Sequence, residues 1–483
     1  MPGILPLTIY SLIFSSSFFS LSNHKNSDIN LFKYLFRYLF TMPLLSDSLL
    51  QGPRTAADLR STLKISQATF SRLTASEPHI LQFGKARATR YALLRPVRGI
   101  ELFPLWRIDE NGRACKWGEL RPCWPQGSCL VSMEGGSWQW FDGIPWYLTD
   151  LRPQGFLGRA WGRNIAQQFE LPEDIRLWQE EDVLFALAMS ANEQSGGWLI
   201  GEAGYQKWIA ASPPAAITED EKLNCYAELA FQALQGEIIG SSAGGEQPKF
   251  MCYAQTGAEY AHRLVKFTAP QTTEAAVRWG DLLIAESLAL AALANAGIES
   301  THAVALMGEN RQVFLETRRF DCVGTEGRRA IVSLESLQSE FVSSPGAWPK
   351  VVAELVKQRQ TDAESLTLTE QIWAFGRLIA NSDMHAGNLS FFLSTPPMKL
   401  TPVYDMLPMA FAPATAGMMR QEAVDLVVDT QVKKEAWDVA IPLANQFWQA
   451  VADDIRISDG FRRIARDMRG KVEQAARSVD RMA

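Results

Sequence analysis

The chain has few cysteines, and they are scattered. Among its 483 residues there are six, at positions 115, 123, 129, 225, 252 and 322, and no two of them form a C-x-x-C pair. That spacing is typical of zinc ribbons and of thiol redox motifs, so the sequence argues against both kinds of site. Isolated thiols are usual in the reducing cytosol, and we expect a cytoplasmic protein.

Long apolar runs are also lacking. Two apolar stretches near the N-terminus, residues 9–21 and 31–40, are both shorter than the roughly 20 residues that a membrane-spanning helix needs. No Lys or Arg precedes Lys25, whereas a signal peptide begins with a positive region. We therefore expect residues 1–41 to be a non-globular extension before a folded protein that opens at Met42, with no membrane partner. An anchor at a membrane interface is the alternative interpretation.

A strong charge of one sign is absent as well. The chain carries 47 Lys and Arg against 53 Asp and Glu, a net charge of -6. Such a protein does not attract nucleic acid as a whole, so any DNA contact must come from a local basic patch. With 47% hydrophobic and 21% charged residues, the composition is that of an ordinary soluble protein, long enough for two or three domains.

Residues 42–98 show the order of elements found in a winged helix. A short helix is followed by predicted helices over 55–63 and 67–75, with a tight turn between them, and then by a hairpin over 80–94. A helix-turn-helix followed by a β-hairpin is typical of DNA-binding domains. The candidate DNA-contacting residues on the second of these helices and the hairpin are Gln67, Thr69, Ser71, Arg72, Lys85, Arg87 and Arg90. A winged helix that docks on another protein is the alternative.

The rest of the chain changes from strand-rich to helix-rich. Residues 99–175 are rich in Trp, Pro and Gly and are predicted to form short strands and loops, and residues 176–315 are mixed. Residues 316–483 are mainly helical, apart from a predicted strand pair at 389–393 and 400–403. This order suits a two-lobed kinase of the α+β class with a helical C-terminal lobe, and no internal repeat is evident.

The strongest chemical signal lies in residues 381–388, Asn-Ser-Asp-Met-His-Ala-Gly-Asn. Asp383 and Asn388 have the spacing of the protein-kinase catalytic loop. Phosphoryl transfer needs a carboxylate that orients the attacking hydroxyl and further ligands that hold Mg²⁺. Asp383 and Asn388 fit these two roles, His385 is a second catalytic candidate, and Asp405 at the end of a predicted strand would be another metal ligand. A helix cap and a turn are the ordinary roles of such residues, but the three in this order favour a kinase.

Upstream residues supply candidate nucleotide contacts. The glycines of residues 240–249 would let backbone N–H groups approach phosphate closely. Lys266 on a predicted strand would contact phosphate, and Glu286 on a predicted helix over 279–295 could pair with it, as kinases require. A surface turn, a solvated lysine and a solvent-facing glutamate are the alternative interpretations of these features.

These motifs together resemble the HipA-like family. They are Ser-Ala-Gly-Gly-Glu-Gln-Pro-Lys249, Leu-Val-Lys266, Glu286 before Ala-Gly297-Ile, Glu316-Thr-Arg-Arg-Phe-Asp321, Asp383-Met-His-Ala-Gly-Asn388 and Pro-Val-Tyr-Asp405. The resemblance runs from about residue 148 to the C-terminus, and Asp150-Leu-Arg-Pro-Gln-Gly-Phe-Leu-Gly158 is similar to the segment that closes the family's N-terminal subdomain. The additional winged helix, with Leu-Leu-Gln-Gly-Pro-Arg-Thr-Ala-Ala-Asp-Leu-Arg, resembles the YjjJ branch.

The resemblance implies a serine/threonine protein kinase with a lipid-kinase-like fold that uses ATP and Mg²⁺. It implies the toxin of a type II toxin–antitoxin pair, with a protein substrate and a HipB-type antitoxin as partners. A homodimer is compatible with it. Autophosphorylation would fall on Ser242, with Ser241 as the alternative, and residues 316–318 would form the hinge beside adenine. The nucleotide-binding residues that it implies are Ala243, Gly244, Gly245, Glu246, Gln247, Lys249, Lys266, Glu286, Glu316, Thr317, Arg318 and Tyr404.

Two residues depart from the family pattern. Gly387 stands where the family often has a lysine before the catalytic-loop asparagine, and Glu246 is acidic where phosphates would lie. A DNA-binding regulator with a nucleotide-sensing kinase lobe therefore stays an alternative. A metal-dependent nuclease that uses Asp383, Asn388 and Asp405 on a phosphodiester is another.

Overall fold

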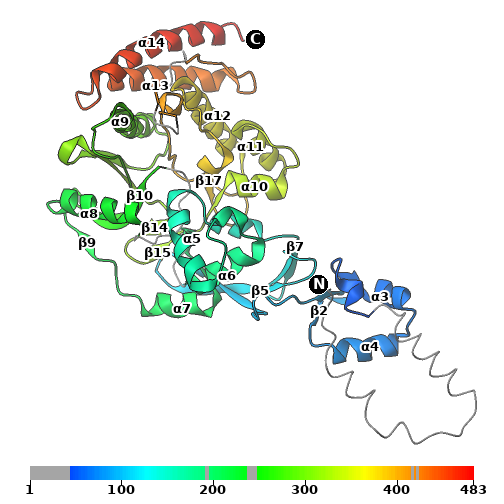
Figure 1. Ribbon diagram of the computed structural model, residues 1–483. Coiled ribbons are helices and arrows are strands. Elements are labelled where there is room, and N and C mark those ends of the chain that lie inside the picture. Colours follow the sequence, from blue (N-terminus) through cyan, green and yellow to red (C-terminus); the bar gives the residue numbers. More distant parts are fainter. Residues whose placement is uncertain (1–43, 191–194, 237–246, 415–417, 420–423, 483) are drawn as a thin grey trace, which may run out of the picture. The chain divides into compact units, whose positions relative to one another are not determined.

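The computed structural model describes residues 44–190, 195–236, 247–414, 418–419 and 424–482. The chain divides into two compact units, one ending at Leu94 and the other beginning at Arg95 (Figure 1). No helix in the described ranges is long and apolar enough to cross a membrane.

The N-terminal unit contains the predicted order of helices and hairpin. Its elements are η1 (Asp47–Leu49), β1 (Arg54–Thr55), α3 (Ala56–Leu63), α4 (Gln67–Ser76), β2 (Ile80–Phe83), η2 (Ala86–Ala88) and β3 (Arg90–Leu93), with sheet order β1-β3-β2. The hydroxyls of Thr55 and Ser66 cap α3 and α4 by accepting from backbone N–H groups. Phe70 of α4 packs edge-on against Tyr91 of β3, with ring centroids 5.0 Å apart, so the second helix is held on the hairpin.

The second unit begins with a five-stranded antiparallel sheet of order β7-β6-β5-β4-β8. Its strands are β4 (Phe103–Ile108), β5 (Ala114–Pro122), β6 (Cys129–Met133), β7 (Trp138–Phe141) and β8 (Trp198–Ile200). The accompanying helices are η3 (Trp146–Leu151), α5 (Gly155–Phe169), η4 (Ile175–Leu177), α6 (Glu180–Ser190), η5 (Ser195–Gly197) and α7 (Gly201–Ala210).

Helix α5 corrects the prediction that residues 99–175 form only short strands and loops. Its glycines suggested irregular structure, but two of them make the helix pack closely instead. A Cβ on Gly162 would lie 2.1 Å from a methyl carbon of Ile175, and one on Gly158 would lie 2.8 Å from the backbone of Pro153. Tertiary packing here outweighs the weak helix propensity of glycine.

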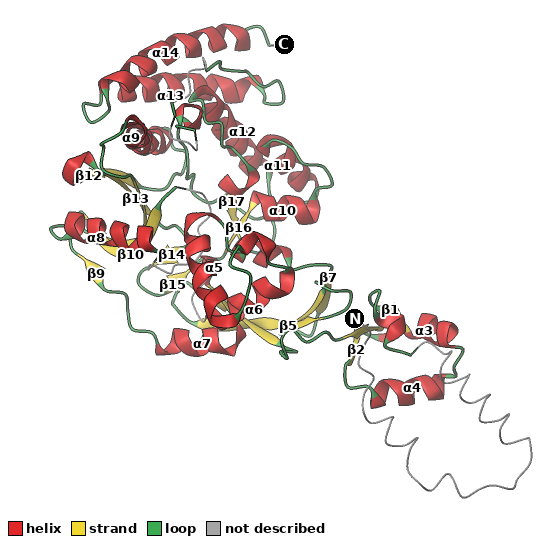
Figure 2. Ribbon diagram, in the orientation of Figure 1, coloured by secondary structure: helices red, strands yellow, loops and turns green. Residues whose placement is uncertain are grey.

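A second five-stranded sheet, of order β12-β13-β11-β10-β9, contains the strand of Lys266. The strands are β9 (Ala216–Ile217), β10 (Lys249–Thr256), β11 (Glu259–Phe267), β12 (Ala303–Met307) and β13 (Val313–Arg318), with η6 (Glu309–Arg311) before β13. Helix α8 (Lys222–Gln235) packs through Tyr226 on Phe250, Val265 and Phe314. Helix α9 (Glu274–Asn295) covers the opposite face, where Leu315 joins the main core (Figure 2).

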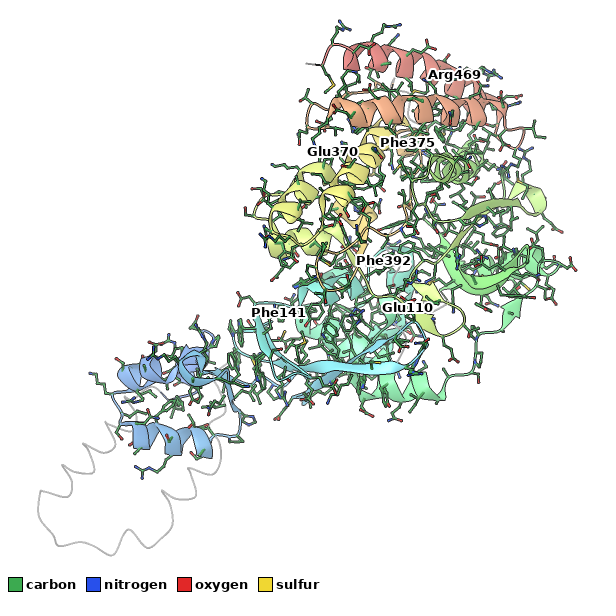
Figure 3. All side chains as sticks on the ribbon, turned by 180° about the vertical axis from the view of Figure 1, so that it is seen from behind. Glu110, Phe141, Glu370, Phe375, Phe392 and Arg469 are labelled. Atoms are coloured by element: carbon green, nitrogen blue, oxygen red, sulfur yellow. The ribbon has the colours of Figure 1, made fainter. Side chains whose placement is uncertain are left out.

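The C-terminal part is mainly helical, as predicted. It contains α10 (Leu334–Phe341), α11 (Trp348–Lys357), α12 (Ala363–Leu378), η7 (Ala386–Asn388), η8 (Met409–Phe411), α13 (Lys434–Asp453) and α14 (Asp459–Val479). Buried aromatic side chains join these helices, and Phe375 of α12 packs against Phe447 of α13 with ring centroids 6.2 Å apart (Figure 3). Small strand pairs are formed by β14 (Cys322–Val323) with β15 (Gly327–Arg328) and by β16 (Ile331–Ser333) with β17 (Ser390–Phe392).

The pairing of β17 extends the predicted strand pair. The expected partner segment is present as an antiparallel bridge between Phe391 and Leu400, with backbone hydrogen bonds from Phe392 to Lys399 and from Thr401 to Ser390. On its other side β17 lies beside β16, with Ser333 opposite Ser390. A local sequence pattern marks a strand but does not identify a partner that lies far away in the chain.

Candidate active site

Lys266 is the centre of a buried cluster of charges. Its Nζ donates to both carboxylate oxygens of Glu286, each at 2.8 Å, and also to Oδ1 of Asp405. Lys266 is 6% exposed and Glu286 is 1% exposed. The pairing of Lys266 with Glu286 that the sequence predicts is therefore present, and the alternative of two solvated side chains is wrong.

The sheet register explains why these residues meet. Lys266 lies opposite Lys249 on one side and Leu315 on the other, and residues directly opposite in antiparallel strands point to the same face. That face is the one that α9 covers, and Glu286 lies on the buried side of α9. Strand β11, helix α9 and the segment that carries Asp405 thus bring Lys266, Glu286 and Asp405 into contact.

The charges in this cluster stabilise one another. Burial by itself lowers the pKa of Lys266, but the carboxylates of Asp405 and Glu286 outweigh it and raise the pKa above its ordinary value. Burial likewise raises the pKa of Asp405, but Lys266 outweighs it and the pKa is lowered. Both groups are therefore ionised at neutral pH. Removing one partner of such a cluster would leave an uncompensated buried charge.

The loop over residues 381–388 is held by hydrogen bonds to its own backbone. Oδ1 of the buried Asn381 accepts from the backbone N–H of Asp383 at 3.0 Å, and Nδ2 of Asn388 donates to the Asp383 carbonyl at 2.9 Å. Trp348 of α11 donates from Nε1 to the His385 carbonyl at 2.9 Å, and Nδ1 of His385 accepts from the Gly387 N–H at 3.1 Å. These contacts engage the backbone of the loop and leave its Asp383 carboxyl as a group that can contact a substrate.

The electrostatic surroundings link Asp383 to the charge cluster. Partial burial raises the pKa of the Asp383 carboxyl, His385 and Lys266 act to lower it, and Asp405 raises it further, with a net upward shift. Asp383 is thus close enough to Lys266, His385 and Asp405 to sense all three charges. A raised carboxyl pKa suits a group that accepts a proton.

Asn388 and Asp405 fit the requirements of a magnesium ion. Because Asn388 uses its Nδ2 on the Asp383 carbonyl, its amide oxygen remains as a ligand. Asp405 adopts a left-handed backbone conformation, with φ of 56°, a geometry that is sparsely populated and is concentrated at functional sites. The described part of the chain has no group of three or more His, Cys, Asp or Glu that could hold a metal. Magnesium commonly takes one or two carboxylates together with substrate phosphates, so these two residues would suffice beside a nucleotide.

Some of the predicted nucleotide-binding residues can be placed. Lys249 is 3% exposed and shares the face of Lys266, and its charge helps to lower the pKa of Asp405. Gln247 donates from Nε2 to the Phe267 carbonyl at 3.3 Å. The other predicted loop residues lie outside the described residues, and they are Ser241, Ser242, Ala243, Gly244, Gly245 and Glu246.

Glu316 points away from Lys266. It lies opposite Val265, which belongs to the face that packs on α8. The carboxylate accepts from the Tyr226 hydroxyl at 2.7 Å and lies 3.0 Å from Nζ of Lys222, and Thr256 also donates to it. Its side chain therefore joins α8 to the sheet, and only its backbone remains for the predicted contact with adenine.

Its neighbours in the predicted hinge alternate in direction. Thr317 lies opposite Leu264, on the face of Lys266, and donates from Oγ1 to the Leu264 carbonyl at 2.9 Å. Arg318 is half exposed and pairs with Glu259 at 3.1 Å. The alternation of side chains along a strand thus separates three residues that the motif presents together.

Tyr404 supports the loop over residues 381–388 through its hydroxyl. Its hydroxyl donates to the Gly387 carbonyl at 2.9 Å and lies 2.7 Å from Oγ of Ser390. Its ring packs near Phe320, with centroids 5.6 Å apart. The predicted role in nucleotide binding would therefore involve its ring, since the hydroxyl is already engaged. The residues that sequence reasoning missed are such supports, namely Asn381, Trp348 and Ser390, which carry no chemical signature of their own.

The predicted DNA-contacting residues gather on one helix and one hairpin of the N-terminal unit. Gln67, Ser71 and Arg72 are exposed on α4, and Lys85, Arg87 and Arg90 are exposed around the hairpin turn. Gln67 accepts from Nη1 of Arg60 at 3.0 Å. Thr69 instead lies 3.0 Å from the capping Ser66 hydroxyl, so it contributes to the start of the helix.

A strand lysine paired with a helix glutamate, next to an Asp–Asn loop and a further aspartate, is the set of groups that protein kinases use around nucleotide phosphates. Models of two protein families match the chain: the middle domain of YjjJ-like toxins over residues 100–209, and the HipA-like C-terminal domain over residues 241–476. The chain is 61% identical to Toxin YjjJ of Escherichia coli (strain K12) over 441 residues, covering 91% of this chain and all of that protein. The chain therefore belongs to the YjjJ-like toxins, which carry a HipA-like C-terminal domain.

Solved structures give weaker likenesses. The HipA of a Shewanella oneidensis MR-1 toxin–antitoxin system, solved in complex with HipB and operator DNA, has 15% identity and a TM-score of 0.49 over 77% of this chain and 95% of that one. The Helicobacter pylori proinflammatory kinase CtkA has 12% identity and a TM-score of 0.33 over 47% of this chain and 90% of that one.

Proposed function

We propose that the protein is a toxin that transfers phosphate from Mg²⁺-bound ATP to serine or threonine residues of a protein substrate. The contact of Lys266 with both Glu286 and Asp405 is the observation that carries this proposal. A lysine held by a helix glutamate is the group that kinases place against nucleotide phosphates. Asp383 would orient the acceptor hydroxyl and take up its proton, and Asn388 and Asp405 would hold the magnesium ion.

Gly387 affects which positive groups would meet the phosphate charge. It replaces a lysine that the family often has, and a Cβ built on it would lie 3.0 Å from Nδ1 of His385 and 3.4 Å from a carboxylate oxygen of Glu335. The phosphate charge would therefore be met by Lys266 and Lys249 rather than by a lysine of the loop. The imidazole of His385 is the remaining loop group that could carry a positive charge beside Asp383.

The proposal can be tested with the purified full-length chain, Mg²⁺ and ATP labelled on the γ-phosphate. We expect labelled protein, either this chain or an added lysate protein, to appear only when both Mg²⁺ and ATP are present. Nucleotide binding without any transfer would contradict the proposal and support a nucleotide-sensing regulator. Cleavage of plasmid DNA with Mg²⁺ alone would support a nuclease instead.

We also propose that the protein phosphorylates itself on Ser242, between the end of α8 and the start of β10. A phosphate there would add roughly two negative charges beside the nucleotide and should expel it by repulsion. Mass spectrometry after ATP treatment should place the phosphate on this residue, and Ser242→Ala should prevent inactivation on prolonged incubation. Ser241→Ala tests the alternative site and should leave the inactivation unchanged. Phosphate found only elsewhere would contradict the assignment.

The N-terminal unit is proposed to bind DNA through α4 and the β2–β3 hairpin. Arg87→Ala should weaken binding to all duplexes alike and reduce the slope of log K against log[salt] by about one unit, because one phosphate contact is lost. Arg72→Ala should instead reduce preference for one sequence, since it lies on the helix that would enter the major groove.

Gel-shift titrations of the full chain across salt concentrations measure both effects. Arg113→Ala, which removes an exposed arginine from the second unit, is the control and should change neither. No binding even at low salt would favour a unit that docks on a protein.

Family membership also supports an antitoxin of the HipB type as a partner, and relief of growth arrest on co-expression would test it.

A further inference from the structure

Asp150 joins the middle domain to the helix beside the catalytic loop. It lies in η3 (Trp146–Leu151), and its Oδ2 accepts from the backbone N–H of Ser333 at 2.7 Å. Its Oδ1 accepts from Oγ of Ser333 at 2.6 Å and from Oγ of Ser336 at 2.8 Å. The neighbouring Thr149 lies 2.6 Å from the same Ser336 hydroxyl. These contacts join residues more than 180 positions apart in sequence.

The donors around Asp150 suit a carboxylate. Ser333 caps the N-terminus of α10, where a negative charge is stabilised by the partial positive charge of the helix end. A carboxylate accepts hydrogen bonds on both oxygens and donates none, and here both oxygens receive donors. An asparagine could keep the backbone donor but would present its NH₂ group to the two hydroxyls, which would have to turn and accept, so Asp150→Asn should weaken the contact while keeping the size of the side chain.

Helix α10 and strand β16 connect Asp150 to the catalytic loop. The N–H of Leu334 donates to the Leu389 carbonyl at 2.7 Å, and Ser333 lies opposite Ser390 in the β16–β17 pair. Ser390 contacts the Tyr404 hydroxyl, which in turn donates to the Gly387 carbonyl. Hydrogen bonds, joined by short backbone segments of β16 and β17, thus connect the middle domain to the loop that carries Asp383 and Asn388.

We propose that Asp150 is a positioning residue, through which the middle domain sets the geometry of the catalytic loop. This inference rests on the proposed phosphoryl transfer for its effect on rate, but the structural coupling stands apart from it. Without the carboxylate, the N-terminus of α10 loses its outer hydrogen bonds, and β17 and the 386–388 turn lose a fixed support. Misplacement of catalytic groups by about 1 Å can reduce a rate by around 10²-fold.

The first measurement compares Asp150→Asn with Glu134→Gln, which removes the same charge from an exposed turn of the middle domain. In steady-state assays with ATP and a protein acceptor, kcat of Asp150→Asn should fall about 10- to 100-fold, whereas KM for ATP should change less than about 3-fold. Glu134→Gln should match the unaltered chain. A rise in KM with unchanged kcat would overturn the positioning role.

The second measurement needs no catalysis. Hydrogen exchange of the amides of residues 386–393 should be faster in Asp150→Asn than in the unaltered chain and unchanged in Glu134→Gln. Unchanged exchange in Asp150→Asn would overturn the inference even if activity were lost. If the unaltered chain transfers no phosphate, the proposed function fails while the exchange result still decides the coupling. Should Asp150→Asn not fold, Ser336→Ala removes only one of its three donors and should show a smaller effect in the same direction.

Discussion

Asp383→Ala should lower phosphoryl transfer about 10²–10⁴-fold, the usual contribution of a positioned general base. The same substitution should abolish growth arrest when the protein is expressed, because toxicity in this proposal requires transfer. ATP binding should be little changed, since Lys266 keeps its contacts with Glu286 and Asp405. Ser382→Ala, at an exposed position of the same loop, is the matched control and should retain activity.

The pKa of Asp383 adds a pH dependence to this prediction. Because burial raises the pKa of Asp383, the proton-accepting form is lost at a higher pH than for an ordinary aspartate as the solution is acidified. The rate should therefore begin to fall above the usual range of Asp, and this acidic limb should be missing from the residual activity of Asp383→Ala. A folded Asp383→Ala protein that is as toxic as the unaltered chain would contradict the kinase mechanism.

Asp405→Asn should remove most of the Mg²⁺-dependent part of nucleotide binding. Asparagine tolerates the left-handed backbone conformation of this position, so the fold should be kept. The substitution replaces a charged metal ligand by a neutral amide, and Lys266 retains Glu286 as its partner. The affinity for ATP measured with Mg²⁺ should therefore fall by at least about 10-fold, whereas the affinity measured with a chelator should change little.

The control for this experiment is Asp438→Asn, on the exposed side of α13, where the carboxylate accepts from Nζ of Lys434. It should bind ATP like the unaltered chain under both conditions. An equal loss with and without Mg²⁺ in Asp405→Asn would mean that Asp405 stabilises the Lys266 cluster and holds no metal. Calorimetric titration of the two variants side by side distinguishes these outcomes.

The sequence alone determined the local parts of this protein. The helices and hairpin of the N-terminal unit, the strand of Lys266, the helix of Glu286 and the order of the catalytic motifs could all be predicted, because side-chain periodicity and capping residues act within a few positions. The contact between Lys266 and Glu286 was expected from the pairing of a strand lysine with a helix glutamate that kinases need. Membership of the family rested on the order of these local motifs.

Only the tertiary structure decided where the distant parts meet. It turned the side chain of Glu316 towards α8, because its partner Val265 belongs to that face, and it paired β17 with the distant β16 as well as with its neighbour in sequence. It also placed Asp150 on the N-terminus of α10, although the two lie more than 180 residues apart. Such contacts depend on packing between remote segments and on burial of their polar groups, which a local pattern of residues does not encode.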